Sequence, residues 1–464
     1  MTTPTTTGKQ IYANYNALWH LQSMGVLDAD QKPNGWDIGD VVEQKTRVAI
    51  IDTSVAFNHP CLIPAINHDL AFDVFSAKLG SFPGYKADAT IDLNGLNLKT
   101  DVADNLPNIR VLLNQLEDRL SANSPARFDG IEPMTSSAFS NHGTAIAGLV
   151  GARPVIAEVA DEYSDSGTEK VEFPLPYVGV DPFCELVPIS TNFDDDPAMM
   201  IVAFLYAELI DADVILLPRD IPDPLRTAPE LNQEMVDGVP LGDAVRQVWP
   251  SEEDRLLWEE LTQLIVNISQ KRPVVCAAGN SQEEFAIYPA NLASEHNGII
   301  SVGAINAKGH RSGYSALKNL TVMAPSNDSQ LFDRHEVRLD EQDVDYSPIG
   351  VPEVNANAKC SHYDIISTDV PGRYGYAFSP FESDEPEDGL REFGSYFCRF
   401  GGTSASSALV AGFLSLGVST GAVAKTADGL EAKNWLISKC EQLSDGDETY
   451  LFPVWYGSAS FPDS

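Results

Sequence analysis

The sequence has few basic residues, and this shortage limits the partners that it can bind. Its 464 residues include 30 Lys and Arg against 67 Asp and Glu, which gives a formal net charge of −37. A surface of that sign repels phosphate backbones and anionic membranes. We therefore expect no nucleic-acid partner and no membrane partner. Solubility is the first explanation of the acidity, and a preference for basic partners or for Ca²⁺ is the alternative.

The sequence also lacks closely spaced cysteines. Its six cysteines are scattered, and no two of them form a CxxC pair. In a chain of this length, that pattern indicates neither a disulfide framework nor a zinc site. Acidic runs at 192–196 and 339–345 could bind Ca²⁺, but they lack the spaced Asp, Asn, Gly and Glu of a dedicated calcium loop. We therefore favour solvated acidic surface for these runs and expect no metal and no cofactor.

A long uninterrupted hydrophobic run is missing as well. The first ten residues are rich in Thr and contain no apolar core of a secretory signal. We expect residues 1–10 to be disordered and the protein to be cytoplasmic. The longest apolar stretch, 199–217, contains Glu208, Asp211 and Asp213. It predicts a helix followed by a strand rather than a membrane span.

Apolar runs typical of buried strands alternate with helical patterns along most of the chain. Such runs separated by helices indicate an α/β fold, with a mostly parallel sheet covered by helices on both faces. We expect strands at 47–52, 184–190, 213–217, 272–278, 298–303 and 320–325. We expect helices near 16–24, 142–151, 198–210, 252–270, 404–418 and 428–441.

Residues 11–464 are predicted to form a single domain that carries long insertions. The proposed insertions are weakly periodic and rich in Pro, Asp, Glu and Ser. They lie near 76–132, 153–176, 219–251, 326–361 and 379–396. The first of them contains an amphipathic helix pattern near 106–120.

Three short motifs place one chemically active residue each beside a predicted buried element. VAIIDTS at 48–54 ends a strand on Asp52, NHGTAIAG at 141–148 opens a helix at His142, and GTSASSALVAG at 402–412 presents Ser404 before another helix. A serine hydroxyl becomes a good nucleophile when an imidazole accepts its proton and a carboxylate orients that imidazole. Each residue alone has an ordinary structural explanation. Together they predict a catalytic triad.

The order Asp, His, Ser along the chain is that of subtilisin. With these motifs, the chain resembles the subtilisin-like serine proteases, or subtilases, as a divergent member. The resemblance implies a subtilisin-like fold and hydrolysis of peptide bonds. The family motif around the serine usually has Met, Pro and His where this chain has Ala405, Ala408 and Leu409. None of these three is a triad position, so the site is interpreted as intact.

The resemblance also assigns the remaining polar groups of the site. VVCAAGN at 274–280 is similar to the family segment that supplies a side-chain amide to the oxyanion, so Asn280 is the expected donor. The backbone N–H of Ser404, at a helix N-terminus, is the expected second donor. His59 lies in a His-Pro pair that resembles a structural His of the family. The other histidines are interpreted as surface residues: His20, His68, His296, His310, His335 and His362.

The substrate cleft departs most from the family pattern. The resemblance implies that substrate backbone pairs with a strand end, which is VILLPRDI at 214–221 here. Pro218 cannot donate a ladder hydrogen bond, and Arg219 and Asp220 bring charge. Asp220 would favour basic substrate residues, and the alternative is that Arg219 and Asp220 pair at the surface. The candidate substrate-binding residues are Leu217, Pro218, Arg219, Asp220, Ala278 and Gly279.

The sequence therefore predicts a serine endopeptidase that acts on a protein or peptide substrate. No folding prodomain is recognised before the Asp52 motif, so we expect restraint by the insertions or by a regulatory protein partner. Two alternatives remain open. One is a peptide ligase or cyclase that uses the same triad, and the other is a catalytically silent docking module.

Overall fold

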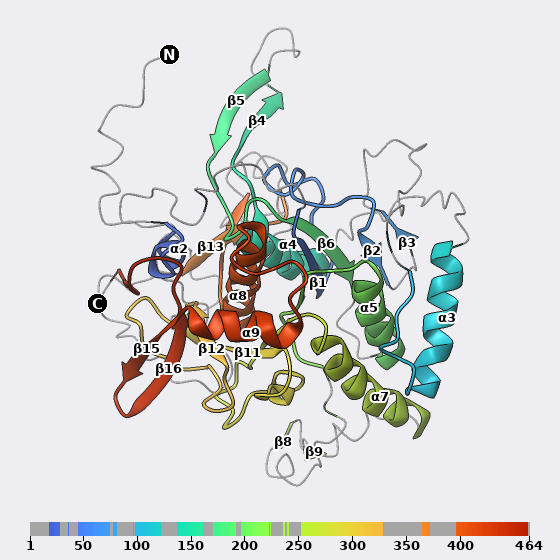
Figure 1. The fold of residues 1–464 in the computed structure, drawn as a ribbon. Coiled ribbons are helices and arrows are strands. Elements are labelled where there is room, and N and C mark those ends of the chain that lie inside the picture. Colours follow the sequence, from blue (N-terminus) through green and yellow to red (C-terminus); the bar gives the residue numbers. More distant parts are fainter. Residues whose placement is uncertain are drawn as a thin grey trace, which may run out of the picture.

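A computed structural model gives the fold, which is drawn in Figure 1. It describes residues 18–27, 45–74, 98–121, 137–160, 170–191, 196–221, 252–327, 364–371 and 396–462, together with positions 36, 78–80, 96, 223, 235, 236, 239 and 240. The predicted disorder of residues 1–10 lies outside these ranges. So does most of each insertion predicted near 219–251, 326–361 and 379–396.

The centre of the molecule is an eight-stranded sheet in the order β12–β11–β10–β7–β1–β6–β2–β3. Every neighbouring pair is parallel except β2 with β3. The strands are β1 (Arg47–Asp52), β2 (Phe72–Asp73), β3 (Lys78–Leu79), β6 (Glu185–Ser190), β7 (Val214–Leu217), β10 (Val274–Ala277), β11 (Ile299–Ile305) and β12 (Val322–Pro325). The expected parallel sheet of an α/β protein is thus confirmed.

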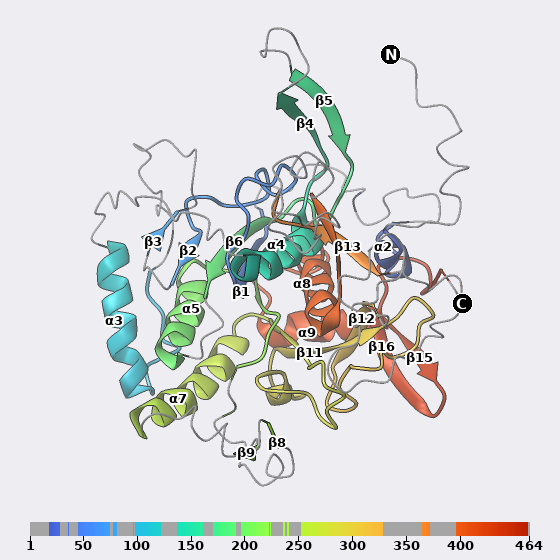
Figure 2. The same ribbon diagram turned by 180° about the vertical axis from the view of Figure 1, so that it is seen from behind.

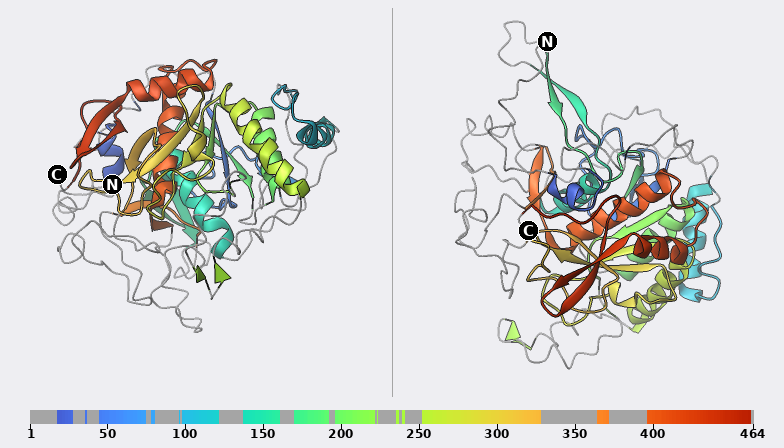
Figure 3. Two further views of the ribbon diagram at one scale, coloured as in Figure 1. Left: turned by 90° about the horizontal axis from the view of Figure 1, so that it is seen from below. Right: turned by 60° about the vertical axis from the view of Figure 1, so that its left-hand side comes forward.

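Helices cover both faces of this sheet, and the two layers lie on opposite sides of it in Figure 3. One layer contains α2 (Trp19–Ser23), α4 (Ser137–Gly151), α8 (Gly402–Ser419) and α9 (Gly429–Ser438). The other contains α3 (Pro107–Ser121), α5 (Pro197–Leu209) and α7 (Glu252–Ser269). Side chains of a strand alternate between faces, so Val48 and Ile50 join the first core while Ala49 and Ile51 join the second. This two-sided burial explains the continuous apolar run of β1.

Helix α8 is the most deeply buried helix of the first layer. Its length and composition would suit a membrane span, yet 94% of it is buried inside the fold. Small residues allow its neighbours to approach closely. A Cβ atom at Gly412 would lie 2.7 Å from Val180 Cβ and 3.1 Å from the Val150 carbonyl oxygen. The small-residue stripe after Ser404 is therefore a packing surface that seats α8 against α4.

Among the described residues, four antiparallel pairs of strands lie outside the central sheet. They are β4 (Val155–Ala160) with β5 (Lys170–Leu175), β8 (Met235–Val236) with β9 (Val239–Pro240), β13 (Ile365–Thr368) with β14 (Phe397–Phe400), and β15 (Cys440–Asp445) with β16 (Glu448–Pro453). The β4–β5 hairpin, which lies in the insertion predicted at 153–176, projects from the body in Figures 1 and 2. The helix expected near 428–441 is present as α9. It ends at Ser438, because the chain then enters β15 and turns back at Gly446 with φ +62°.

Candidate active site

The predicted site residues lie at the carboxyl edge of the parallel sheet. Asp52 is the last residue of β1 and is 1% exposed. Pro218 follows the neighbouring strand β7, and Ala278 follows β10 on the far side of β7. Parallel strands end at the same edge of a sheet, which is where ligands of open α/β folds bind. Three separate sequence motifs are therefore brought to one edge.

Asp52 and His142 are in direct contact. The Nδ1 atom of His142 lies 2.7 Å from Asp52 Oδ2 and 2.9 Å from Oδ1. The N–H of Thr53 donates a second hydrogen bond to Oδ1, at 2.6 Å. A carboxylate acceptor at Nδ1 favours the tautomer that carries its proton there, which makes Nε2 the basic nitrogen.

The start of α4 is held tightly against the loop that follows Asp52. The N–H of Gly143 donates to Thr53 Oγ1 at 2.9 Å. A Cβ atom at Gly143 would lie 2.3 Å from the Thr53 carbonyl oxygen and 2.7 Å from that of Ser54, so only glycine fits. The helix begins at Ser137 rather than at His142 as predicted, so His142 lies in its second turn. The close approach at Gly143 keeps the imidazole beside Asp52.

Ser404 is the third residue of α8 and is 8% exposed. Its Oγ donates to the carbonyl oxygen of Pro218 at 2.8 Å. The helix begins at Gly402, two residues before the predicted start. Ser404 therefore lies in the first helical turn, against the residue that follows β7.

The side chain of Asn280 is oriented by Thr403. Its Oδ1 accepts hydrogen bonds from Thr403 N–H at 2.8 Å and from Thr403 Oγ1 at 3.0 Å. A backbone N–H can only donate, so the oxygen faces Thr403 and the Nδ2 group faces away from it. Among the described residues, no acceptor is recorded for Asn280 Nδ2, and the Ser404 N–H belongs to the first helical turn, whose N–H groups have no intrahelical acceptor. Two donors are thus open next to the serine.

The candidate cleft residues occupy the two segments that flank Ser404. Leu217 and Ala278 are fully buried, and Gly279, with φ +118°, donates its N–H to Thr403 Oγ1 at 3.2 Å. Arg219 is only 7% exposed, and its Nε donates to the backbone carbonyl of Asp220 at 3.3 Å. The alternative that Arg219 and Asp220 form an ion pair at the surface required an exposed Arg219, and Arg219 is buried. Asp220 itself is exposed.

His59 is wholly buried close to the Asp52 loop. Its Nδ1 accepts the Cys61 N–H at 3.1 Å, so Nε2 carries the proton and donates to the Tyr396 carbonyl oxygen at 2.8 Å. Burial lowers the pKa of His59 to about 4. The neutral ring ties the loop after β1 to the residue that precedes β14, which supports its structural assignment.

His20 was placed at the surface by the sequence, and this was wrong. It is completely buried in α2 between Trp19 and Leu21, and burial lowers its pKa to about 3. A single His between the apolar residues Trp19 and Leu21 does not by itself show whether its helix is enclosed. The five-residue helix, however, is enclosed by the core and has buried side chains on several sides.

The cysteines and the acidic groups offer no metal site in the described residues. Five described cysteines are free thiols, and burial raises the pKa of Cys276 to about 12. No cluster of three or more His, Cys, Asp or Glu side chains suited to a metal ion occurs in the same ranges. Of the two acidic runs, only Asp196 is described. It caps α5 by accepting the N–H groups of Ala198 at 2.8 Å and Met199 at 3.3 Å.

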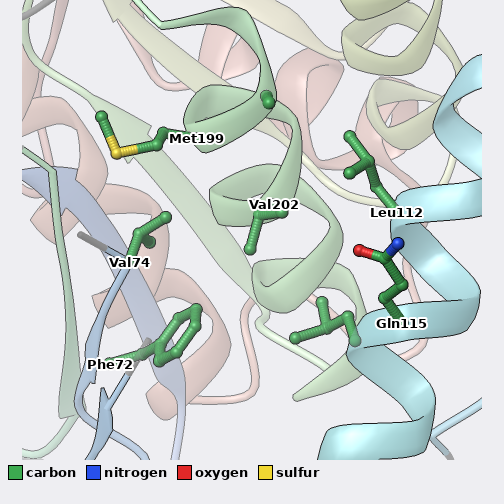
Figure 4. Close-up of a pocket in the computed structure, with 8 residues that line it drawn as sticks. Phe72, Val74, Leu112, Gln115, Met199 and Val202 are labelled. Carbon is green, nitrogen blue, oxygen red and sulfur yellow. The ribbon is translucent and has the colours of Figure 1, made fainter. Parts of the chain in front are cut away.

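A separate pocket opens between β2, α3 and α5, on the face of the sheet opposite α8. Its volume is about 160 Å³. Figure 4 shows Phe72, Val74, Leu112, Met199 and Val202 around it. None of the candidate site residues lines it, so it is distinct from the edge that carries Ser404.

Comparisons with known proteins agree with the geometry. Residues 247–449, which include Asn280 and Ser404, match the model of the subtilase family. No curated protein sequence matches the chain significantly.

Among solved structures, a lanthipeptide protease is 13% identical, covers 95% of this chain and 90% of its own, and has a TM-score of 0.50. A cold-adapted subtilisin-like serine proteinase is 13% identical, and the match covers 96% of this chain and 100% of that protein with a TM-score of 0.47. The nisin leader peptidase NisP from Lactococcus lactis is 13% identical, and the match covers 93% of this chain and 90% of that protein with a TM-score of 0.47. The match over 247–449 is to the family that the sequence motifs resemble, and the similarity to the lanthipeptide protease shows that the chain has a subtilisin-like fold.

Proposed function

We propose that the protein is a serine endopeptidase with Ser404 as its nucleophile. His142 Nε2 accepts the hydroxyl proton while Ser404 Oγ attacks the substrate carbonyl carbon and gives up its hydrogen bond to Pro218. Asp52 holds the imidazole and stabilises the imidazolium that forms. His142 then protonates the leaving amine, and water hydrolyses the acyl-enzyme by the same proton transfers in reverse.

The observation that carries this proposal is the pair of open donors beside Ser404. A tetrahedral intermediate places negative charge on the former carbonyl oxygen, and preorganised donors stabilise that charge most strongly. Among the described residues, no acceptor is recorded for Asn280 Nδ2, and the Ser404 N–H lies in the first helical turn. An oxyanion would accept a hydrogen bond from each of them. A silent docking module gives no reason for that arrangement.

The cleft is proposed to bind peptide in a modified way. Pro218 removes one backbone donor from the strand end, so pairing with substrate must rely on carbonyl oxygens and on the residues after it. Exposed Asp220, on a protein with a net charge of −37, is proposed to favour substrates with basic residues. We further propose that the protein works in the cytoplasm under restraint by its insertions or by a protein partner.

Hydrolysis can be separated from peptide ligation by the origin of the new oxygen atom. The protein and its Ser404→Ala variant are incubated with a peptide library in H₂¹⁸O, and the products are analysed by mass spectrometry. We expect new C-termini that contain ¹⁸O with the wild type and no products with the variant. Joined peptides without ¹⁸O would instead assign a ligase. Unprocessed peptides would contradict both activities.

A further inference from the structure

The turn that precedes Ser404 has a conformation that needs outside support. Gly402 has φ +77°, a left-handed conformation in which side chains are strained. A Cβ atom at the preceding Gly401 would lie 2.1 Å from Asn327 Oδ1. The backbone of this turn therefore lies directly against a buried polar side chain.

Two side chains bind both backbone polar groups of Gly402. Its N–H donates to the Tyr314 hydroxyl oxygen at 3.1 Å, and its carbonyl oxygen accepts from Ser326 Oγ at 2.9 Å. The Tyr314 and Ser326 hydroxyl oxygens are 2.6 Å apart. When the single proton of the Tyr314 hydroxyl is donated to Ser326 Oγ, the three contacts form a closed ring of hydrogen bonds. Tyr314 is 1% exposed and Ser326 is fully buried, so water does not compete with the ring.

Asn327 offers alternative acceptors for the one proton of the Tyr314 hydroxyl. Its Oδ1 lies 2.9 Å from the Tyr314 hydroxyl and 3.4 Å from the Gly402 nitrogen, while its carbonyl oxygen lies 3.0 Å from the same hydroxyl. The Tyr314 hydroxyl oxygen therefore contacts Gly402 in the turn, and Ser326 and Asn327 in the segment after β12. If the Tyr314 side chain served only for apolar packing, its hydroxyl group would be unnecessary, because burying a hydroxyl without a hydrogen bond is unfavourable.

The ring of hydrogen bonds acts on the residues that the proposed function uses. Gly402 is followed by Thr403, whose N–H is bound by Asn280, and then by Ser404. Successive residues of the turn are therefore bound from two directions, by the residues on either side of β12 and by the segment after β10. A buried backbone donor that loses its partner tends to move to find another. A shift of Gly402 would change the direction of the Ser404 N–H.

We propose that Tyr314, together with Ser326, is a positioning residue that fixes the nucleophile turn and aims the Ser404 N–H at the oxyanion. The role in turnover rests on the proposed peptidase function. The role in holding the turn does not, and it can be measured separately.

The test compares Tyr314→Phe with a matched control, Tyr206→Phe. Tyr206 is also fully buried and donates its hydroxyl to the Leu70 carbonyl oxygen at 2.8 Å, but it belongs to the core on the other face of the sheet. In Tyr314→Phe we expect kcat to fall about tenfold, equivalent to about 1.4 kcal/mol, with KM within about twofold of the wild-type value. In Tyr206→Phe we expect wild-type kcat at a similar loss of thermal stability.

Amide hydrogen exchange gives a second readout that does not need activity. We expect faster exchange at residues 402–404 in Tyr314→Phe and unchanged exchange there in Tyr206→Phe. Ser326→Ala, which removes the other arm of the ring, should act in the same direction and replaces Tyr314→Phe if that variant does not fold.

Each outcome decides one of the two claims. Wild-type kcat and wild-type exchange at 402–404 in Tyr314→Phe would overturn the positioning role. Faster exchange with unchanged kcat would keep the support of the turn but remove its link to catalysis. A wild type without peptidase activity would reject the proposed function, and the exchange result would still decide whether Tyr314 holds the turn.

Discussion

His59 should make the stability of the protein fall as the solution becomes acidic. Burial lowers its pKa from 6.5 to about 4. The unfolded chain therefore binds a proton at a higher pH than the folded protein does. Between these two values protonation favours unfolding. The contribution of the neutral ring is complete above pH 6.5 and is lost as the pH falls towards 4.

The size of the effect follows from the two pKa values. At pH 4.5 an unfolded His with pKa 6.5 is almost fully protonated, whereas a folded His with pKa near 4 is largely neutral. Linkage then gives a loss of about 2.5 kcal/mol at pH 4.5 relative to pH 7.5. The ring is completely buried, so solvent screening does not reduce this figure much.

The measurement is urea unfolding, followed by tryptophan fluorescence, at pH 7.5 and pH 4.5. His59→Asn keeps an acceptor for the Cys61 N–H but does not titrate. At pH 7.5 we expect the variant to be less stable by about 1–3 kcal/mol, because it loses the bond to Tyr396 and part of the ring volume. At pH 4.5 that gap should shrink by about 2.5 kcal/mol.

A control and a refuting result complete the experiment. His296→Asn changes a ring whose side chain is 84% exposed, and its unfolding should follow the wild type at both pH values. If the gap between the wild type and His59→Asn has the same size at pH 7.5 and pH 4.5, the imidazole is not held neutral by the fold and the reasoning fails.

Three further changes test other parts of the structure. Asn280→Ala should lower kcat by about 10²–10³ with little change in KM, because an oxyanion donor acts on the transition state; steady-state kinetics with an unchanged kcat would contradict its role. Gly143→Ala should destabilise the fold by about 1–3 kcal/mol, since its Cβ would meet the Thr53 carbonyl; an unchanged thermal midpoint would refute the close approach. Burial lowers the pKa of Lys433 to about 8, so stability should rise between pH 8 and 10.5 in the wild type but not in Lys433→Met; parallel urea midpoints would show that this lysine is not responsible.

The sequence was most informative where one physical pattern decides the structure. Strands such as β1 and β7 are buried on both faces, so their residues form continuous apolar runs that need no tertiary information. Helix starts were less accurate. Helix α8 begins at Gly402 because Tyr314, Ser326 and Asn280 hold its first backbone groups, and residues so distant in sequence leave no mark on the local pattern.

The same reasoning explains what the sequence revealed of the site. Asp52 and His142 could be named from their motifs and chain order, and the structure places them in contact. Tyr314 and Ser326 could not, because they lie 88 and 76 residues from Gly402 in the chain and no motif includes them. His20 was misjudged because a single His between apolar residues does not show whether the helix is enclosed.

The central claim is that Ser404 is a nucleophile activated by His142. The most direct test is labelling with a fluorophosphonate probe, read by intact mass, of the wild type, Ser404→Ala and His142→Ala. We expect one adduct on the wild type, none on Ser404→Ala, and labelling of His142→Ala that is slower by at least about 10²-fold. Labelling that persists in Ser404→Ala, or a wild type that stays unlabelled while an active serine protease in the same tube reacts, would contradict the account.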